Sequence, residues 1–389
     1  MTEFVPLRDI ADFISTGKTP PTKETKYFGG DVYWYTPGDL DREKHLQASV
    51  RSLTELAFTD KKAAVFPADT LLITCIGDIG KLGITSNKSS SNQQITGIKP
   101  NERADVSYLY YWFRFSKYYL EQSANNAVVP ILNNRALEKI KIPLPPLAEQ
   151  KKIAAILDAA DQLRQKDQQL IDHYTALSQS LFLEMFGDPV SNPMGWEKGA
   201  SIDHSDCIVP GRDKPRSFTG SIPWITTNDL QCLEETILSK KDIGLSNEEV
   251  SLVKARVIPR GSVLLTCVGD LGIVSINATP VVVNQQLHTF QCDSDYLIPE
   301  FMMYALSYQK PYMTKMASST TVPYMNKKVC NGIPMIYPPV ELQKEFSRNV
   351  DLVTQQRKQA IAGLKSTETL FNSLLQKAFK GELTITKAA

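Results

Sequence analysis

Hydrophobic positions form two long helical patterns in this chain. The stretch from Gln150 to Phe186 contains no proline or glycine, and its apolar residues recur in steps of three and four, which is the spacing of a coiled-coil seam. A second stretch beginning near Phe346 repeats this pattern. The predicted seam residues are Ile153, Ile156, Leu163, Leu170, Leu177, Leu181, Phe346, Val350, Val353, Leu364, Phe371 and Leu374.

The two helical patterns predict an antiparallel pair. Long periodic helices need a partner for their apolar stripe, and each stretch offers the other a stripe of similar length. Because a folded domain lies between them in the sequence, the chain would leave one helix, fold and return along the other. The alternative is two separate helices, each packed on its own domain.

An internal repeat indicates that the chain arose by duplication. Residues 65–80 align with 257–272 at an offset of 192, and 8 of the 16 positions are identical. The segment Asn-Gln-Gln at 92–94 recurs at 284–286 with the same offset. A period this long exceeds the 20–50 residues of a solenoid repeat, so it marks two copies of a whole domain with its helical tail.

Each copy is predicted to be a mixed α/β domain. Thr70–Ile76 and Ser262–Val268 are apolar, β-rich runs that end in Gly-Asp turns, which predicts buried strands. Tyr108–Gln122 and, more weakly, Pro299–Tyr308 predict helices. The predicted fold class is α/β, with two duplicated domains joined by two long helices in an antiparallel coiled coil and a pseudo-twofold arrangement. The predicted segments are 1–147, 148–188, 189–340 and 341–389.

Composition and charge describe an ordinary globular protein with little net charge. The chain is 42% hydrophobic and 22% charged, so wholesale disorder is disfavoured. No apolar run approaches a membrane span, and the N-terminus lacks signal-peptide features, so we expect a cytoplasmic protein. The net charge of +1 is low for a lone DNA-binding protein. If the chain binds DNA, either its basic residues gather on one face or partner subunits supply much of the affinity.

The chemically reactive residues predict no catalytic site and no metal site. The six cysteines form no CxxC pair, and His204 with Cys207 is the nearest approach to metal-ligand spacing, so we expect reduced thiols. The sequence lacks the Gly-rich loop and the Asn/Asp-Pro-Pro-aromatic tetrapeptide of an adenine methyltransferase. It also lacks an ATP phosphate loop, a Gly-x-Ser-x-Gly elbow and an HExxH motif. We therefore expect a non-catalytic chain without a cofactor of its own.

These features resemble the specificity subunits of type I restriction-modification systems, over essentially the whole chain. The resemblance rests on the order, duplication and spacing of four motifs. These are Pro-Pro-Leu-x-Glu-Gln-x-x-Ile at 145–153, Met-Phe-Gly-Asp at 185–188, Asn-Pro-Met-Gly-Trp at 192–196 and Pro-Pro-x-x-x-Gln-x-x-Phe at 338–346. The last motif departs from the first in the order of residues 341–343, which affects only the local helix start.

The resemblance implies two target-recognition domains that each read one half of a split double-stranded DNA site. It implies two methyltransferase subunits and further restriction-translocase subunits as partners, with S-adenosylmethionine, ATP and Mg on those partners. The long helices would hold the two halves apart. A helix from Gln150 to Phe186 spans about 54 Å, on the order of 16 base pairs of duplex, so it can serve as a ruler.

Base-reading residues are expected where the two copies differ, because two halves that read different sequences need different side chains. The amides at 92–94 and 284–286 match adenine edges, yet they recur unchanged. This recurrence favours structural amide bonding or a shared backbone contact. The same argument favours a tight turn at Gly77-Asp78 and Gly269-Asp270.

Three pairs of polar loops differ between the copies: 17–27 with 211–217, 86–91 with 277–281, and 125–135 with 318–328. Their Arg and Lys side chains suit phosphate or guanine, the alternative being ordinary solvated loop charges. The candidate DNA-binding residues are Lys18, Lys23, Lys26, Lys88, Asn92, Gln93, Gln94, Arg135, Arg212, Lys214, Arg216, Asn284, Gln285, Gln286, Lys327 and Lys328.

Two functions of other classes stay open at this point. A duplicated hydrolase or single-chain modification enzyme would bind a cofactor or turn over substrate alone. A scaffold with two modules that bind other ligands would show no preference for duplex DNA, even with partner subunits present.

Overall fold

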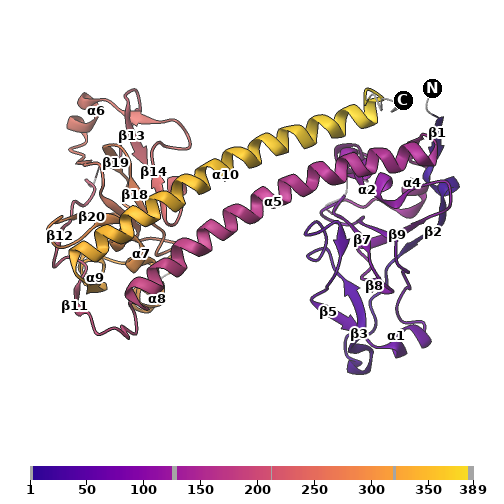
Figure 1. The fold of residues 1–389 in the computed structure, drawn as a ribbon, viewed down its shortest axis with the longest axis horizontal. Helices are drawn as coiled ribbons and strands as arrows, with labels where there is room; N and C mark the ends of the chain where they lie inside the picture. Colours follow the sequence, from indigo (N-terminus) through magenta and orange to yellow (C-terminus); the bar gives the residue numbers. More distant parts are fainter. Residues whose placement is uncertain (1–2, 125–128, 212, 319–320, 384–389) are drawn as a thin grey trace. The chain divides into compact units, whose positions relative to one another are not determined.

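The computed structural model describes residues 3–124, 129–211, 213–318 and 321–383. The chain divides into two units, the first comprising 1–168 with 362–389 and the second comprising 169–361. Each unit holds one α/β domain and one part of each long helix. The long helices are α5 (Leu147–Phe186) and α10 (Val340–Lys380) (Figure 1).

The first domain is built on a mixed sheet. Its strands are β1 (Glu3–Pro6), β2 (Ala11–Thr16), β3 (Phe28–Tyr35), β4 (His45–Leu46), β5 (Arg51–Leu53), β6 (Leu71–Thr74), β7 (Leu82–Thr85), β8 (Ser89–Ser91), β9 (Ile95–Pro100) and β10 (Lys141–Leu144). The main sheet has the order β2-β9-β6-β7-β4, and the smaller sheets have the orders β5-β3-β8 and β1-β10. β6 pairs antiparallel with β7 and β9, whereas β4 pairs parallel with β7.

The helices of the first domain begin where the sequence supplies caps. They are α1 (Glu55–Thr59), α2 (Val106–Phe115), α3 (Lys117–Gln122) and α4 (Asn134–Glu138), with 3₁₀ turns at Leu7–Ile10 and Thr25–Tyr27. The Asp105 carboxylate accepts a hydrogen bond from the Tyr108 N–H (2.9 Å) and so caps α2. The predicted single helix 108–122 was wrong in one respect, because it breaks at Ser116 into α2 and α3.

The second domain repeats the design of the first. Its strands are β11 (Glu197–Ala200), β12 (Ser205–Asp206), β13 (Ile222–Ile225), β14 (Glu234–Thr236), β15 (Gly244–Leu245), β16 (Val257–Ile258), β17 (Val263–Thr266), β18 (Val274–Asn277), β19 (Val281–Val283), β20 (Leu287–Cys292) and β21 (Pro334–Tyr337). Its helices are α6 (Asn247–Leu252), α7 (Pro299–Ser307), α8 (Lys310–Met316) and α9 (Lys327–Asn331), with a 3₁₀ turn at Thr227–Asp229. The order β12-β20-β17-β18-β14 matches the main sheet of the first domain position by position, beside the orders β15-β13-β19-β16 and β11-β21.

The core of each domain lies where the apolar runs predicted it. All residues of β6 and β17 are buried, which confirms the two predicted buried strands. The helix α2 packs against β7 in the first unit, and α7 packs against β18 in the second. The two copies therefore fold as equivalent α/β domains.

The long helices pair in antiparallel fashion, as predicted. In the first unit, Phe371 and Leu375 of α10 share a hydrophobic core with Ile153 of α5. In the second unit, the ring of Phe346 at the start of α10 lies 5.5 Å from that of Phe182 near the end of α5. Early α5 thus meets late α10, and late α5 meets early α10.

The predicted seam was only partly correct. Ile156, Leu163, Leu170 and Leu177 are exposed by 36%, 49%, 44% and 50%, so these four predictions were wrong. The helix carries two apolar stripes, and periodicity alone does not tell which one faces inward. Of the other predicted residues, Ile153, Phe346, Val350 and Phe371 are buried, and Leu181, Val353, Leu364 and Leu374 are half-buried.

Candidate nucleic-acid interface

In the first unit, backbone hydrogen bonds bring separate loops to one end of the domain. The turn after β6 lies at the centre, because the Cys75 N–H donates to the Gln94 carbonyl (2.8 Å) and the Cys75 carbonyl accepts from the Leu132 N–H (2.9 Å). The Gly77 N–H donates to the Pro130 carbonyl (3.0 Å). The Asn-Gln-Gln segment and the third candidate loop are therefore fixed against the same turn.

The second unit repeats this arrangement. The Cys267 N–H donates to the Gln286 carbonyl (2.9 Å), and the Met325 N–H donates to the Cys267 carbonyl (2.9 Å). The Gly269 N–H donates to the Pro323 carbonyl (3.0 Å). The third loop and the amide segment converge on the equivalent turn.

The first candidate loop joins the same end of each domain. The Thr19 hydroxyl donates to Gln93 Oε1 (2.5 Å), and Gln285 Nε2 donates to the Gly211 carbonyl (2.8 Å). We call this end of each domain the loop end. It comprises residues 17–19, 75–78, 92–94 and 129–135 in the first unit, and 211, 213–218, 267–270, 284–286 and 321–328 in the second.

The Asn-Gln-Gln segments bond to themselves in the same way in both domains. Asn92 Nδ2 donates to Gln94 Oε1 (2.9 Å), and the Gln94 N–H donates to Asn92 Oδ1 (3.1 Å). Asn284 and Gln286 make the equivalent bonds at 3.0 and 3.1 Å. These contacts support the structural interpretation of the repeated amides, because they hold the segment in a turn.

The Gly-Asp turns are tight turns, as their recurrence predicted. Gly77 and Gly269 adopt φ values of 80° and 81°, in the left-handed region that favours glycine. Asp78 pairs with Lys81 (3.0 Å), and the hydrogen bond from that ammonium lowers the pKa of the Asp78 carboxyl.

Three candidate lysines are engaged with their own domain. The contacts are Lys18 Nζ to the Lys61 carbonyl (2.7 Å), Lys26 to Glu24 (3.0 Å) and Lys88 to Glu55 (2.6 Å). Lys88 is also separated from the loop end, because it precedes β8 whereas Asn92 follows that strand. The loop 86–91 therefore does not bring its lysine to the other candidates.

Six candidate basic residues remain available for a ligand. They are Lys23, Arg135, Lys214, Arg216, Lys327 and Lys328, all exposed. Within the described residues, none of the six has a side-chain hydrogen bond or ion pair. Arg212 lies outside the described residues. Exposed Arg and Lys side chains of this kind suit phosphate oxygens and guanine edges.

A buried glutamine fastens each long helix to its domain, a role that the motif alone did not reveal. Gln150 is fully buried. Its Oε1 accepts from the Asp105 N–H (2.9 Å), and its Nε2 donates to the Arg103 and Pro145 carbonyls (2.9 and 2.8 Å). Gln343 repeats all three bonds, with the Ile298 N–H (2.9 Å), the Tyr296 carbonyl (3.0 Å) and the Pro338 carbonyl (2.8 Å).

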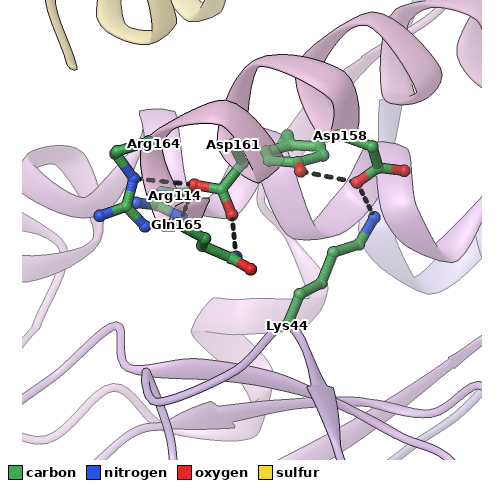
Figure 2. A network of polar contacts seen from close by, with 7 residues as sticks. Lys44, Arg114, Asp158, Asp161, Arg164 and Gln165 are labelled. Atoms are coloured by element: carbon green, nitrogen blue, oxygen red, sulfur yellow. Dashed lines mark hydrogen bonds and ion pairs between the residues drawn. The ribbon is translucent and has the colours of Figure 1, made fainter. Parts of the chain in front are cut away.

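Ion pairs hold the side of α5 against the first domain (Figure 2). Asp158 pairs with Lys44, which precedes β4 and is almost buried, with 9% of its side chain exposed. The Tyr111 hydroxyl donates to the same carboxylate (2.7 Å), and the Lys44 ammonium lies 4.8 Å from the Tyr111 ring. Sequence reasoning missed this contact, because 114 residues separate Lys44 from Asp158.

A second carboxylate lies one turn further along α5 (Figure 2). Asp161 is 5% exposed at its side chain and accepts from Arg164 Nε (3.0 Å) and Gln165 Nε2 (2.8 Å). Arg114 approaches it to 3.7 Å and also lies over the Phe371 ring of α10 at 4.8 Å. Asp161 is therefore a hydrogen-bonded, paired charge of the kind that interiors tolerate.

The second unit makes its lateral contact with the opposite polarity. Glu234 of β14 pairs with Arg357 of α10, and the next residue Glu235 pairs with Lys358 (2.7 Å). The domain thus supplies the anions and the helix supplies the cations. In the first unit, the Lys44–Asp158 pair has these signs reversed.

A cysteine and a histidine meet in the second unit, but not as a nucleophile and its base. Cys207 Sγ lies 3.1 Å from His288 Nε2, and Asn331 Oδ1 lies 2.9 Å from that same nitrogen. A catalytic arrangement needs the orienting group on the other ring nitrogen. Burial lowers the pKa of His288 to about 4 and raises the pKa of the Cys207 thiol. Both groups are thus held neutral near pH 7, which does not favour the hydrolase alternative.

The described residues give no structural sign of a metal centre or a membrane span. No cluster of three or more His, Cys, Asp or Glu side chains suited to a metal ion occurs among them. His204, which the sequence placed near metal-ligand spacing, stacks on the Tyr296 ring at 4.7 Å. No described helix has the length and apolar character needed to cross a bilayer.

Comparison with known proteins shows which family this chain resembles. The family model described as "Type I restriction modification DNA specificity domain" matches residues 2–172 and 211–363. The type I restriction enzyme MjaIX specificity subunit of Methanocaldococcus jannaschii is 25% identical over 421 residues, covering 97% of this chain and 93% of that protein. The type I restriction enzyme EcoBI specificity subunit of Escherichia coli is 22% identical, covering 82% of this chain and 74% of that protein.

Solved structures share the fold. The S subunit of a type I restriction-modification system from M. genitalium superposes with a TM-score of 0.62 at 14% identity, covering 97% of this chain and 96% of that one. The resemblance inferred from the four sequence motifs is confirmed. With one copy of the matched domain in each half, the chain belongs to the family of type I restriction-modification DNA specificity subunits.

Proposed function

We propose that each loop end reads one half of a split double-stranded DNA target, and that the paired long helices set the distance between the two halves. One observation carries this proposal: loops that differ between the copies converge on equivalent turns in both domains, Cys75 in one and Cys267 in the other. A duplicated frame that presents different side chains at one fixed place is what reading two different sequences requires.

The contacts between each domain and its long helix support a role for the helices as a spacer of fixed length. The buried amides of Gln150 and Gln343 fix the start of each long helix to its own domain. Lateral ion pairs add a second contact in each unit. A spacer can transmit a defined distance only when the readers are held firmly at its ends.

The exposed apolar stripe of α5 supports docking of methyltransferase subunits. Ile156, Leu163, Leu170 and Leu177 follow one another at seven-residue spacing, and each is at least one-third exposed. A row of exposed aliphatic residues at heptad spacing is the kind of surface that a partner helix would cover. We infer that two methyltransferase subunits bind here and carry S-adenosylmethionine, and that further restriction-translocase subunits carry ATP and Mg.

The test is to express the chain with the methyltransferase subunits of its own system and to map modified adenines on host DNA by single-molecule sequencing. We expect two short specified blocks separated by a fixed unspecified gap, lost when this chain is omitted. Modification that persists without the chain, or a single continuous motif with it, would overturn the proposal.

Matched variants assign the loop ends. Lys214→Ala with Arg216→Ala is expected to weaken modification of every target that carries the block read by the second domain. Lys88→Ala is the control, because that lysine is paired away from the loop end. Leu163→Glu is expected to release the methyltransferase subunits in size-exclusion chromatography while leaving the chain folded.

A further inference from the structure

The loop end of the second unit contains a cavity lined partly by candidate DNA-binding residues and partly by aromatic rings that the proposed groove contacts do not use. Its volume is about 390 Å³. Its lining residues are Lys214, Pro215, Phe218, Trp224, Asn284, Gln285 and Gln286. The lining combines an aromatic wall, a group of amides and one cation at a place where DNA is expected to lie.

The aromatic wall has one exposed ring. Phe218 and Trp224 pack with their ring centroids 5.9 Å apart and their planes at 54°. Trp224 is 8% exposed and supports the wall, whereas Phe218 is 37% exposed and presents its ring to the cavity. An exposed ring of this kind stacks with any nucleobase, because every base has a π-face.

The amide wall is fixed before any ligand arrives. Asn284 Nδ2 and Gln286 Oε1 are bonded to each other at 3.0 Å, and Gln285 holds the Gly211 carbonyl at 2.8 Å. Gln286 is exposed. Carboxamides present both donors and acceptors, which match the hydrogen-bonding edges of nucleobases.

A carboxylate holds the segment that carries Phe218. Glu249, in α6, accepts from the Thr219 N–H (3.1 Å) and from the Ser246 N–H (2.8 Å). A hydrogen bond from Ser217 makes the largest contribution in lowering the pKa of Glu249 to about 2. The residue that follows Phe218 is thus tied to an anion that stays charged at neutral pH.

The phenylalanine of the first domain that corresponds to Phe218 has different surroundings. The pattern Phe-x-Gly-x-Val/Ile-x-Trp occurs at 28–34 and again at 218–224. In the first domain, the Arg51 guanidinium lies 5.6 Å from both the Phe28 and the Trp34 rings. In the second domain, the strand neighbour of Trp224 is Ile243 rather than an arginine. A cation covers the aromatic pair in one copy, and a cavity lies beside it in the other.

We propose that the second domain's cavity receives a nucleobase extruded from the target duplex, with Phe218 stacking on it, Gln286 contacting its edge and Lys214 contacting a neighbouring phosphate. This inference rests on the proposed function. Side chains that read an intact groove project from the protein into the DNA. A concave pocket can hold only a group that projects from the DNA toward the protein, and an extruded base is such a group.

The test is a mismatch scan on the complex of this chain with its methyltransferase subunits. Duplexes carry the mapped target with one base pair at a time replaced by a mismatch, and Kd is measured by fluorescence anisotropy. Mismatches ease extrusion, so we expect one base pair of the specified blocks at which a mismatch tightens binding about 10-fold. The methylated adenines are left out of the comparison, because methyltransferases extrude their own target base.

The Phe218→Ala variant tests whether the cavity causes that preference. Loss of one base–aromatic stack is expected to weaken binding of the paired target by about 5-fold to 150-fold and to abolish the preference for the mismatch. Phe218→Tyr keeps the ring and is expected to retain both properties. Leu238→Ala removes another exposed apolar side chain of the same domain and is expected to behave like the wild type.

The outcomes separate this inference from the proposed function. If the complex binds its target specifically but mismatches never tighten binding outside the methylated adenines, the extruded-base inference is wrong and the proposed function stands. The same conclusion follows if folded Phe218→Ala binds like the wild type. If the complex shows no sequence preference at all, the proposed function is wrong and this inference is wrong with it.

Discussion

The two junctions between domain and long helix share one contact and differ in another. Gln150 and Gln343 make the same three hydrogen bonds to their own domains. The lateral ion pairs have opposite polarity, with a lysine on the first domain and glutamates on the second. The glutamine contact therefore belongs to the duplicated design, whereas the ion pairs changed after the two copies diverged.

The register of the strands shows that the two lateral contacts begin at equivalent positions of the two domains. His45 of β4 pairs with Ile84, and Glu235 of β14 pairs with Ile276, 192 residues later. Lys44, just before β4, and Glu234, the first residue of β14, therefore occupy matching positions. The first domain therefore carries a cation at the place where the second carries an anion.

The helices carry matching charges at these junctions, because Arg357 of α10 corresponds to Arg164 of α5. Asp158 and Asp351 lie at matching positions of α5 and α10, eight residues after the equivalent glutamines. Burial first, and then the charge of Glu235, raises the pKa of Asp351, and Glu234 pairs instead with Arg357. Glu234 thus pairs with the arginine of this shared helix pattern, whereas Lys44 pairs with its aspartate. The two domains therefore pair with different members of one charge pattern that both helices carry.

The largest effect is expected from the shared contact. Gln150→Ala and Gln343→Ala each remove three hydrogen bonds from one fully buried side chain, which is expected to lower the free energy of unfolding of the affected unit by about 2–4 kcal/mol. Urea unfolding followed by hydrogen-exchange mass spectrometry resolves the two units.

Two exposed glutamines serve as controls for this prediction, Gln162→Ala on α5 and Gln359→Ala on α10, and both are expected to be nearly neutral. A loss at Gln150 without a similar loss at Gln343 would show that the two junctions do not share one stabilising design.

A smaller effect is expected from the contact that differs. Asp158→Lys places a second cation beside Lys44 and is expected to destabilise the first unit by about 2–3 kcal/mol, since Lys44 is nearly buried. Adding Lys44→Glu restores a pair of opposite charges at this contact with the two signs exchanged. The double variant is expected to recover at least about 1 kcal/mol in a double-mutant cycle.

Recovery in this cycle is expected to be incomplete, because the Tyr111 hydroxyl also donates to Asp158. Strictly additive effects of the two substitutions would contradict the conclusion that Lys44 and Asp158 stabilise the first junction as a pair.

The duplication made much of the fold predictable, because each element could be checked against its copy. The buried strands at 70–76 and 262–268 and the antiparallel helices followed from local patterns and their recurrence. The register of the helical seam did not follow, since α5 carries one apolar stripe through Ile153 and Leu157 and another through Leu163. Which stripe is buried depends on the segments that pack against it in the tertiary structure, and these are distant in the sequence.

The candidate site was predictable only in part, for a related reason. Recurrence favoured a structural role for the amides at 92–94 and 284–286, which the bonds within each segment support, and it directed attention to loops that meet at one end. It did not show that Lys88 pairs with Glu55, 33 residues away. Ion pairs between distant segments leave no periodic signal, so the Lys44–Asp158 contact was equally invisible. The contribution of each candidate residue to DNA binding stays a prediction.

The smallest of the three effects concerns a titrating residue that only the second copy has. His288 occupies the position of Thr96 in the first domain, and burial lowers its pKa from 6.5 to about 4. The folded unit therefore keeps His288 neutral, whereas the unfolded chain binds a proton below pH 6.5. This contribution to stability is fully present above pH 6.5 and is lost as the pH falls toward 4.

At pH 5, the cost of keeping His288 neutral is about 2 kcal/mol relative to pH 8. We expect His288→Thr, which installs the residue of the first copy, to flatten the dependence of the second unit's unfolding free energy on pH between 6.5 and 4. The unfolding free energy of the second unit is measured by urea unfolding at each pH. A hydrogen-exchange pulse at one fixed pH then reports which unit has unfolded. His45 in the first unit also has a pKa lowered by burial. Because the exchange pulse reports each unit by itself, the effect of His45 is distinguished from that of His288. An unchanged pH dependence in the variant would mean that other groups, and not the residue that distinguishes the two copies, control the acid sensitivity of the second unit.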